Sequence, residues 1–214
     1  MFISMLFVPG LAQGQVKKDT TQVEKHYKID EVVVTGTKNE TDRRYLPMTV
    51  SVVNQQQISQ HYEPSLLPIL TEQVPGLFTT SRGVMGYGVS AGAAGGISLR
   101  GIGGSPTTEL LVLIDGHPQY MGLMGHPLAD AYQSMLAEKV EVVRGPASVL
   151  YGSNAMGGVI NIVTHKSQEE GIKNNIQVGY GSYNTLMAEA SDFVKKGRFS
   201  SVSSISYDRT DGHR

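Results

Sequence analysis

The chain has 214 residues, a formal net charge of -1 and no cysteine. A near-neutral charge without a basic run argues against nucleic acid as a partner. The lack of cysteine excludes disulfides, thiolate metal sites and a lipid-modified N-terminal cysteine. The 25 glycines make up about 12% of the chain, above the usual share of about 7%. This excess favours tight turns over long helices.

The first residues, MFISMLFVPGLAQGQ, form a short apolar run that ends in Ala12-Gln13-Gly14. Ala12 and Gly14 are small residues at the two positions that a signal peptidase inspects, and they predict a signal peptide over residues 1–14. The abrupt change to polar sequence after Val16 favours export over a buried N-terminal strand, although no Lys or Arg precedes the run and the true start can lie upstream. No later segment reaches the roughly 20 apolar residues of a spanning helix, so membrane entry would require a β-barrel.

The stretch DEVVVTGTK, from Asp30 to Lys38, has a strong strand preference but polar flanks, QVKKDTTQVEKHYK before it and NETDRR after it. Three consecutive valines with an exposed backbone edge are normally paired or covered. We find no neighbouring strand in the sequence and therefore expect this segment to be unpaired within the chain.

The next segments alternate between strands and helices. PMTVSVVNQQQISQ predicts a strand with Val50 and Val52 on one face, followed by a short polar helix. EPSLLPILTEQVPGL predicts a helix with Ser65 as its N-cap and a stop at Pro75-Gly76. The glycine-rich stretch from Ser81 to Gly96 predicts a loop.

Five further segments complete a small domain up to Thr164. ISLRGIGG predicts a strand and a turn, and ELLVLIDGHP a strand buried on both faces. EKVEVVRGP predicts a strand, ASVLYG one helical turn, and GGVINIVTH another strand, whereas Met121 to Met135 is loop-like. The pattern indicates an α+β domain with a small mixed sheet.

The pattern changes after Thr164. IQVGYGSYNTLMAEASDF and GRFSSVSSISYDRT alternate apolar and polar residues, with a turn expected at Lys195-Lys196-Gly197. The pair predicts a hairpin whose arms match the roughly 9 to 11 residues of a tilted membrane strand. An ordinary soluble hairpin is an equal alternative on this evidence alone.

No pattern supports an enzyme, and we expect no catalytic residue, metal or cofactor. RGIGGS is followed by a strand instead of a helix, which argues against a dinucleotide site. The histidines at positions 61, 117 and 126 do not have ligand spacing, and Asp115-Gly116 is foremost a turn signal. Arg144 ends a buried strand without an obvious carboxylate partner, because we expect Glu138 and Glu141 to be exposed; an Arg reaching solvent is equally compatible.

The segment VEVVRGPASVLYGSNAMGGVINIVT, Val140 to Thr164, resembles the plug domain of TonB-dependent outer-membrane receptors. ISLRGIGG and LLVLIDGHP resemble the same family in the same order, and EVVVTGT stands where the family has its TonB box. The resemblance implies a signal peptide over 1–14, a periplasmic linker with the TonB box over 15–44 and a plug over 45–165. The first strands of an antiparallel transmembrane β-barrel would follow over 174–214, too few to close a barrel of about 22 strands, so we expect a truncated product or a fragment.

The resemblance also implies roles for individual residues. The TonB box, gripped by a TonB-type energy-transducing protein of the inner membrane, would comprise Asp30, Glu31, Val32, Val33, Val34, Thr35 and Gly36. Arg100 and Arg144 correspond to plug arginines that face glutamates of the barrel wall. Contacts to an extracellular nutrient would come from Met85, Tyr87, Tyr120, Met121 and His126.

The function that the resemblance implies is energised uptake of a scarce large nutrient, such as an iron-siderophore, haem or cobalamin, through the cell outer membrane. The barrel would contact outer-membrane lipid, and the N-terminus would lie in the periplasm. The alternative is a soluble periplasmic binding module that uses the plug without a barrel. A secreted enzyme is disfavoured, because no catalytic constellation is present.

Overall fold

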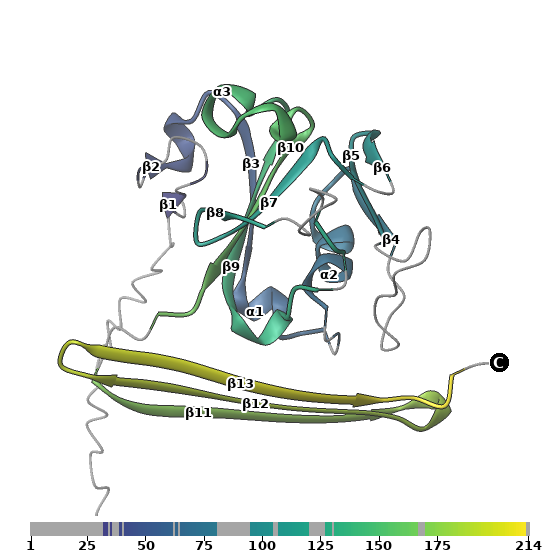
Figure 1. Ribbon diagram of the computed structural model, residues 1–214, viewed down its shortest axis with the longest axis vertical. Helices are drawn as coiled ribbons and strands as arrows, with labels where there is room; N and C mark the ends of the chain where they lie inside the picture. Colours follow the sequence, from purple (N-terminus) through teal and green to yellow (C-terminus); the bar gives the residue numbers. More distant parts are fainter. Residues whose placement is uncertain are drawn as a thin grey trace, which may run out of the picture.

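The fold is seen in a computed structural model that describes residues 32–33, 35, 39, 41–61, 63, 65–80, 95–104, 107–119, 127–129, 131–166 and 170–212 (Figure 1). An N-terminal domain, residues 41–166, is built around a mixed sheet. A long three-stranded sheet follows it in the chain. The expected signal peptide and most of the glycine-rich stretch after Thr80 lie outside the described residues.

The central sheet has five strands in the order β3-β9-β10-β7-β8. The pairing of β10 with β7 is parallel and the other pairings are antiparallel, which confirms the predicted mixed sheet. The strands are β3 (Thr49–Asn54), β7 (Leu110–Ile114), β8 (His117–Pro118), β9 (Ala137–Arg144) and β10 (Gly158–Thr164).

Short helices begin and end where the sequence predicted. Helix α1 (Gln55–Ile58) starts with a capping box, in which Asn54 Oδ1 accepts from Gln57 N at 3.0 Å and Gln57 Oε1 accepts from Asn54 N at 3.0 Å. Helix α2 (Leu66–Gln73) follows Ser65, whose hydroxyl donates to Ala129 O at 3.2 Å instead of capping the helix. Single turns are formed by η1 (Arg43–Tyr45), η4 (Ser134–Leu136), α3 (Ser148–Tyr151) and η5 (Ser153–Ala155).

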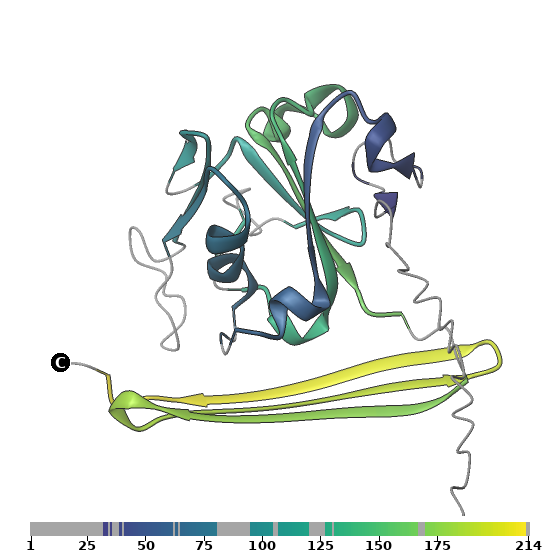
Figure 2. The ribbon, with the colours of Figure 1, turned by 180° about the vertical axis from the view of Figure 1, so that it is seen from behind.

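Apolar side chains are buried on both faces of the central sheet. On one face, Val140, Val142 and Ile160 pack with the buried leucines of α2. On the other face, Val143 and Val159 form a smaller cluster. Figures 1 and 2 show α2 on one side of this sheet and the β1–β2 pair, described below, on the other. The predicted burial of both faces is therefore confirmed.

A second small sheet extends from the end of α2. It consists of β4 (Leu77–Thr80), β5 (Gly96–Leu99) and β6 (Ile102–Gly104), all antiparallel. The β5–β6 turn holds Arg100 in the left-handed region at φ 53°, and Arg100 N donates to Gly76 O at 2.7 Å. The ISLRGIGG motif thus forms a hairpin, one strand more than predicted.

The C-terminal strands form a long antiparallel sheet beneath the N-terminal domain (Figure 1). Its strands are β11 (Gly171–Gly181), β12 (Thr185–Lys196) and β13 (Phe199–Arg209), of 11, 12 and 11 residues. The predicted hairpin turn is present at Gly197, which has φ 57°. The first predicted arm, however, contains two strands, because η6 (Ser182–Asn184) reverses the chain with Tyr183 and Asn184 at positive φ.

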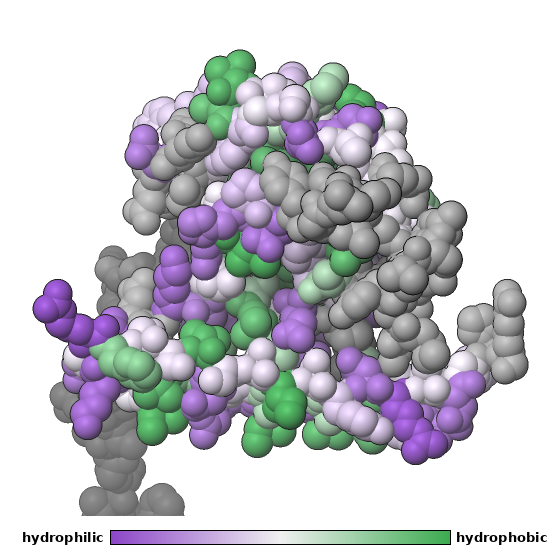
Figure 3. All heavy atoms as spheres, in the orientation of Figure 1, coloured by the Kyte–Doolittle hydropathy of each residue, from purple (hydrophilic) through white to green (hydrophobic). Residues whose placement is uncertain are grey.

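The two faces of this long sheet differ in polarity. Asn175 and Gln177 face the N-terminal domain together with Met187 and Glu189. The alternate residues Ile176, Val178, Tyr180, Ile205 and Tyr207 are exposed, by 75%, 65%, 74%, 71% and 56% of their surface. Figure 3 shows hydrophobic side chains along the lower edge of the sheet, away from the domain. None of the described helices is long and apolar enough to cross a membrane.

Candidate functional site

The segment with the three valines is paired within the chain. Strand β1 (Val32–Val33) runs antiparallel to β2 (Thr41–Asp42), with Val32 opposite Asp42 and Val33 opposite Thr41. Our expectation that the chain offers no edge for this segment is therefore wrong. The partner strand was not recognised in the polar sequence after Lys38. Its pairing involves two residues, Thr41 and Asp42, which need no apolar pattern to form backbone hydrogen bonds.

Thr35 lies just beyond β1 and is buried, with 1% of its surface exposed. Its backbone N donates to Glu141 Oε2 at 2.8 Å, and its Oγ1 donates to the same oxygen at 2.5 Å. The hydroxyl of Tyr151, on α3, donates to Thr35 O at 3.0 Å. Hydrogen bonds therefore hold Thr35 through its backbone N–H and hydroxyl on one side and through its carbonyl on the other.

Glu141 is fully buried in the middle of β9, with 0% of its surface exposed. Its neighbours across the sheet are Val52 on β3 and Asn161 on β10. Because residues two apart in a strand share a face, Glu141 lies on the face of Val143 and Lys139. Lys139 Nζ lies 2.9 Å from Glu141 Oε1. Our expectation that Glu141 is exposed is wrong, since distant partners supply the hydrogen bonds that burial of a carboxylate requires.

These contacts keep the carboxylate charged. Burial alone would raise the pKa of Glu141, but the hydrogen bonds from the Thr35 hydroxyl, Lys139 and the Thr35 N–H outweigh it and lower this pKa below its ordinary value. Burial and the charge of Glu141 raise the pKa of Tyr151, so its hydroxyl remains a donor. We call the group Thr35, Lys139, Glu141 and Tyr151 the Thr35 anchor.

The Thr35 anchor has the donors and acceptors to hold a peptide segment. The described residues contain no group of three or more His, Asp or Glu that could hold a metal ion. Asp115 is structural, because its carboxylate accepts from Thr164 N at 3.0 Å and from Thr164 Oγ1 at 2.6 Å and ties the end of β7 to β10.

The two predicted arginines lie at the ends of strands. Arg144, at the end of β9, is half-buried, and its Nε is a buried atom without a hydrogen-bond acceptor among the described residues. Arg100 is exposed in the β5–β6 turn. Neither guanidinium forms an ion pair within the part of the chain that the structure describes, so a role toward a wall beyond these residues stays a prediction.

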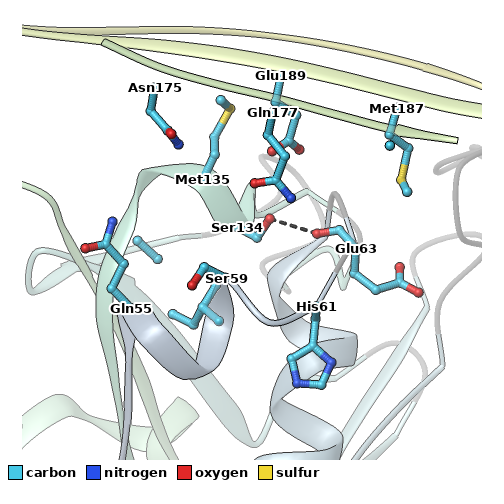
Figure 4. A pocket seen from close by; sticks show the side chains of 13 residues that line it. Gln55, Ser59, His61, Glu63, Ser134, Met135, Asn175, Gln177, Met187 and Glu189 are labelled. Atoms are coloured by element: carbon cyan, nitrogen blue, oxygen red, sulfur yellow. Dashed lines mark hydrogen bonds between the residues drawn. The ribbon is translucent and has the colours of Figure 1, made fainter. Parts of the chain in front are cut away.

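A pocket lies between α1 and the inner face of the long sheet (Figure 4). Gln55, Ser59 and His61 line its lower side in this view, and Asn175 and Glu189 line its upper side. His61 Nδ1 lies 3.6 Å from Glu72 Oε2, so this histidine is engaged by its own domain. His117 is exposed in β8. His126, a predicted nutrient contact, lies outside the described residues.

A comparison with protein families gives one match. The model of the TonB-dependent Receptor Plug Domain matches residues 42–159, which include β9, with Glu141, and Tyr151. The chain belongs to this family. The family resemblance expected from the sequence is confirmed, and the N-terminal domain is a TonB-dependent receptor plug domain.

Solved receptor structures share the plug fold. They include the alcaligin outer membrane receptor FauA from Bordetella pertussis, with 22% identity over 85% of this chain and 30% of that chain and a TM-score of 0.65. The pyoverdine outer membrane receptor FpvA from Pseudomonas aeruginosa has 19% identity over 84% and 24%, with a TM-score of 0.62. The ferric yersiniabactin uptake receptor FyuA from Yersinia pestis has 23% identity over 76% and 24%, with a TM-score of 0.56.

At these identities the likeness shows the fold alone, and the chain spans less than a third of each of these receptors. The predicted fold class, a plug with a mixed sheet followed by antiparallel strands, is confirmed. The predicted nutrient contacts of the plug, Met85, Tyr87, Tyr120, Met121 and His126, lie outside the described residues. So do Asp30, Glu31, Val34 and Gly36 of the predicted TonB box.

The sequence reasoning missed three members of the Thr35 anchor, namely Lys139, Glu141 and Tyr151. One signal for Glu141 was available. It stands between Val140 and Val142 in a strand that has neighbours on both sides, where an exposed charge is unexpected. The identity of its partner, 106 positions away, has no local signature.

Proposed function

We propose that the chain is the plug and the first barrel strands of an outer-membrane receptor that takes up a ferric siderophore with energy supplied by a TonB-type protein. The N-terminal segment would face the periplasm, and the segment from Asp30 to Gly36 would be the TonB box. Membership in the plug family and the likeness to siderophore receptors support this proposal.

The two-faced sheet of β11 to β13 is the observation that carries the proposal. Asn175, Gln177 and Glu189 face the plug. The alternate apolar residues Ile176, Val178, Tyr180, Ile205 and Tyr207 face outward and are exposed. A soluble protein rarely leaves such an apolar face uncovered, whereas a barrel wall in lipid alternates in this way. Strands of 11 and 12 residues also meet the length of about 9 to 11 residues that a tilted membrane strand requires.

The pairing of β1 supports the proposed role of the TonB box. Among the described residues of this segment, two, Val32 and Val33, pair with β2, so little of the described backbone pairing must be broken to release them. A released extended segment can add to the sheet edge of a partner through main-chain hydrogen bonds. The anchor at Thr35 would then mark the point where the pulled segment meets the folded plug.

The proposed substrate class comes from the relatives. FauA is a receptor for alcaligin, FpvA for pyoverdine and FyuA for ferric yersiniabactin. We therefore favour a ferric siderophore over haem or cobalamin. The residues proposed to touch it are Met85, Tyr87, Tyr120, Met121 and His126.

Uptake of radioiron tests the proposal. Iron-starved cells with and without the receptor gene receive radioiron loaded on alcaligin, pyoverdine or yersiniabactin, before and after collapse of the proton motive force. We expect surface binding in both conditions and accumulation only in energised cells. Accumulation that does not need the proton motive force, or recovery of the protein in the soluble periplasmic fraction, would contradict the proposal; the second result would favour the soluble binding module.

A further inference from the structure

Glu141 is an unusual choice for its position. It lies on the face of the central sheet where Val52 and Val143 belong to an apolar cluster, and it has no exposed surface. An apolar residue of similar volume would avoid the cost of burying a charge and is often at least as stabilising. The carboxylate therefore calls for an explanation beyond the stability of the sheet.

The two carboxylate oxygens are engaged from different sides. Lys139, on the same strand, reaches Oε1, whereas both Thr35 donors converge on Oε2. Lys139 moves with β9, but Thr35 belongs to the N-terminal segment. Withdrawal of that segment removes two charge-assisted hydrogen bonds from Oε2 and leaves the charge inside the plug.

The position of β9 in the sheet determines which strands are affected by the loss of the Thr35 hydrogen bonds. β9 pairs with β3 along six positions, from Thr49↔Arg144 to Asn54↔Lys139, and with β10 on its other side. A buried charge that loses its hydrogen bonds costs free energy unless water or a proton reaches it. Glu141 has no exposed surface while Thr35 is in place, so water reaches its carboxylate only when Thr35 or another part of this cover moves away.

Tyr151 adds a second connection. Its hydroxyl donates to Thr35 O, and its ring packs against the same apolar cluster as Val143. Movement of Thr35 therefore also removes a hydrogen bond from α3, which covers that cluster. Both consequences of withdrawal act on one face of the central sheet.

We propose that Glu141 is a positioning residue that couples the N-terminal segment to the plug core, so that withdrawal of Thr35 removes two of the hydrogen bonds that compensate its buried charge and loosens β9 within the central sheet. The proposal rests on the proposed function only for the origin of the pull. The coupling itself is a property of the Thr35 anchor.

Constant-force pulling on the purified full receptor tests this coupling. Because the chain has no cysteine of its own, a Cys placed at Val33 gives a single attachment point within it. In the receptor with Glu141 intact, we expect the central sheet to open at the same time as the N-terminal segment is released, or shortly afterwards. With Glu141→Leu we expect earlier release, and a sheet that survives after release at least about tenfold longer than in the wild type, since no carboxylate is left without the hydrogen bonds from Thr35.

Two further variants make the result specific. Thr35→Val removes the Oγ1 donor and should shorten the anchored state about tenfold, whereas Thr35→Ser keeps the hydroxyl and should behave as wild type. If Glu141→Leu does not assemble, Glu141→Gln, which is neutral but retains an acceptor, should lengthen the lifetime of the sheet in the same direction. Equal sheet lifetimes after release in the wild type and the Glu141 variant would overturn the proposal.

Transport separates this role from a merely structural one. We expect Glu141→Leu to keep the ligand Kd and the amount of receptor in the membrane, while the maximal rate of energised uptake falls. A rise in Kd together with loss of receptor would instead mark Glu141 as structural and overturn the proposal. The pulling experiment uses neither nutrient nor TonB-type partner, so a failure of the proposed function, seen in radioiron uptake, leaves its outcome unaffected.

Discussion

Thr35 and Glu141 lie 106 positions apart in the chain and meet inside the plug, where one oxygen of the carboxylate accepts two hydrogen bonds from the threonine. The contact fixes an N-terminal segment to β9, an inner strand of the central sheet. Of the described residues ahead of Thr35, Val32 and Val33 pair with β2, whereas Thr35 is held by hydrogen bonds to a buried charge.

Thr35→Val should weaken this attachment. The variant keeps the backbone donor but loses the hydroxyl, and a hydrogen bond to a charged group contributes about 1.5–3 kcal/mol. A nitroxide label attached at Val33→Cys reports the mobility of the segment in its electron paramagnetic resonance spectrum. The ratio of the mobile to the immobile component should therefore rise about tenfold or more. Thr35→Ser is the matched control and should leave the spectrum unchanged; equal mobility in both variants would show that the hydroxyl does not hold the segment.

The anchor should weaken in acid. Because its partners lower the folded-state pKa of Glu141 below the ordinary value of 4.5, its contribution to stability is fully present above that value. It is lost as the pH falls through the folded-state pKa, since the unfolded chain then binds the proton more readily. We expect the difference in free energy of unfolding between wild type and Glu141→Gln to shrink from about pH 7 to about pH 3. A constant difference over this range would show that the charge of Glu141 makes no contribution.

A charged side chain on the outward face of the long sheet should destabilise the receptor in lipid. Ile176→Lys places an ammonium on the apolar face, at a cost of about 2–4 kcal/mol near the bilayer midplane. Gln177→Lys, one residue further along β11, faces the plug and should cost much less. Urea unfolding of the receptor in lipid vesicles measures both, and equal destabilisation by the two variants would contradict the assignment of the faces.

The elements of the plug were predictable because their patterns are local. The strands β7 and β10 are continuous apolar runs that need burial on both faces, and α2 shows its inward leucines between Ser65 and the Pro75-Gly76 stop. The alternation after Gly171 likewise predicted the two faces of the long sheet. In the long sheet the turn at Ser182–Asn184 was missed, because Tyr183 and Asn184 adopt left-handed backbone without a glycine.

The Thr35 anchor could not be predicted in the same way. A carboxylate in a strand is expected at the surface, since burying it without partners is costly. The partners of Glu141 come from the N-terminal segment and from its own strand, and no periodicity links the former to β9. The pairing of β1 with β2 was missed for a related reason, because Thr41–Asp42 is too short and too polar to show a strand pattern.

Energised uptake by a Val33→Pro receptor tests the central claim most directly. Proline removes the backbone donor that a partner strand would need from the proposed TonB box, while Val33→Thr keeps the donor and a branched side chain. We predict that Val33→Pro binds the ferric siderophore with wild-type affinity but accumulates no radioiron, and that Val33→Thr accumulates it normally. Wild-type accumulation by Val33→Pro would contradict the assignment of Asp30 to Gly36 as the segment that the TonB-type protein grips.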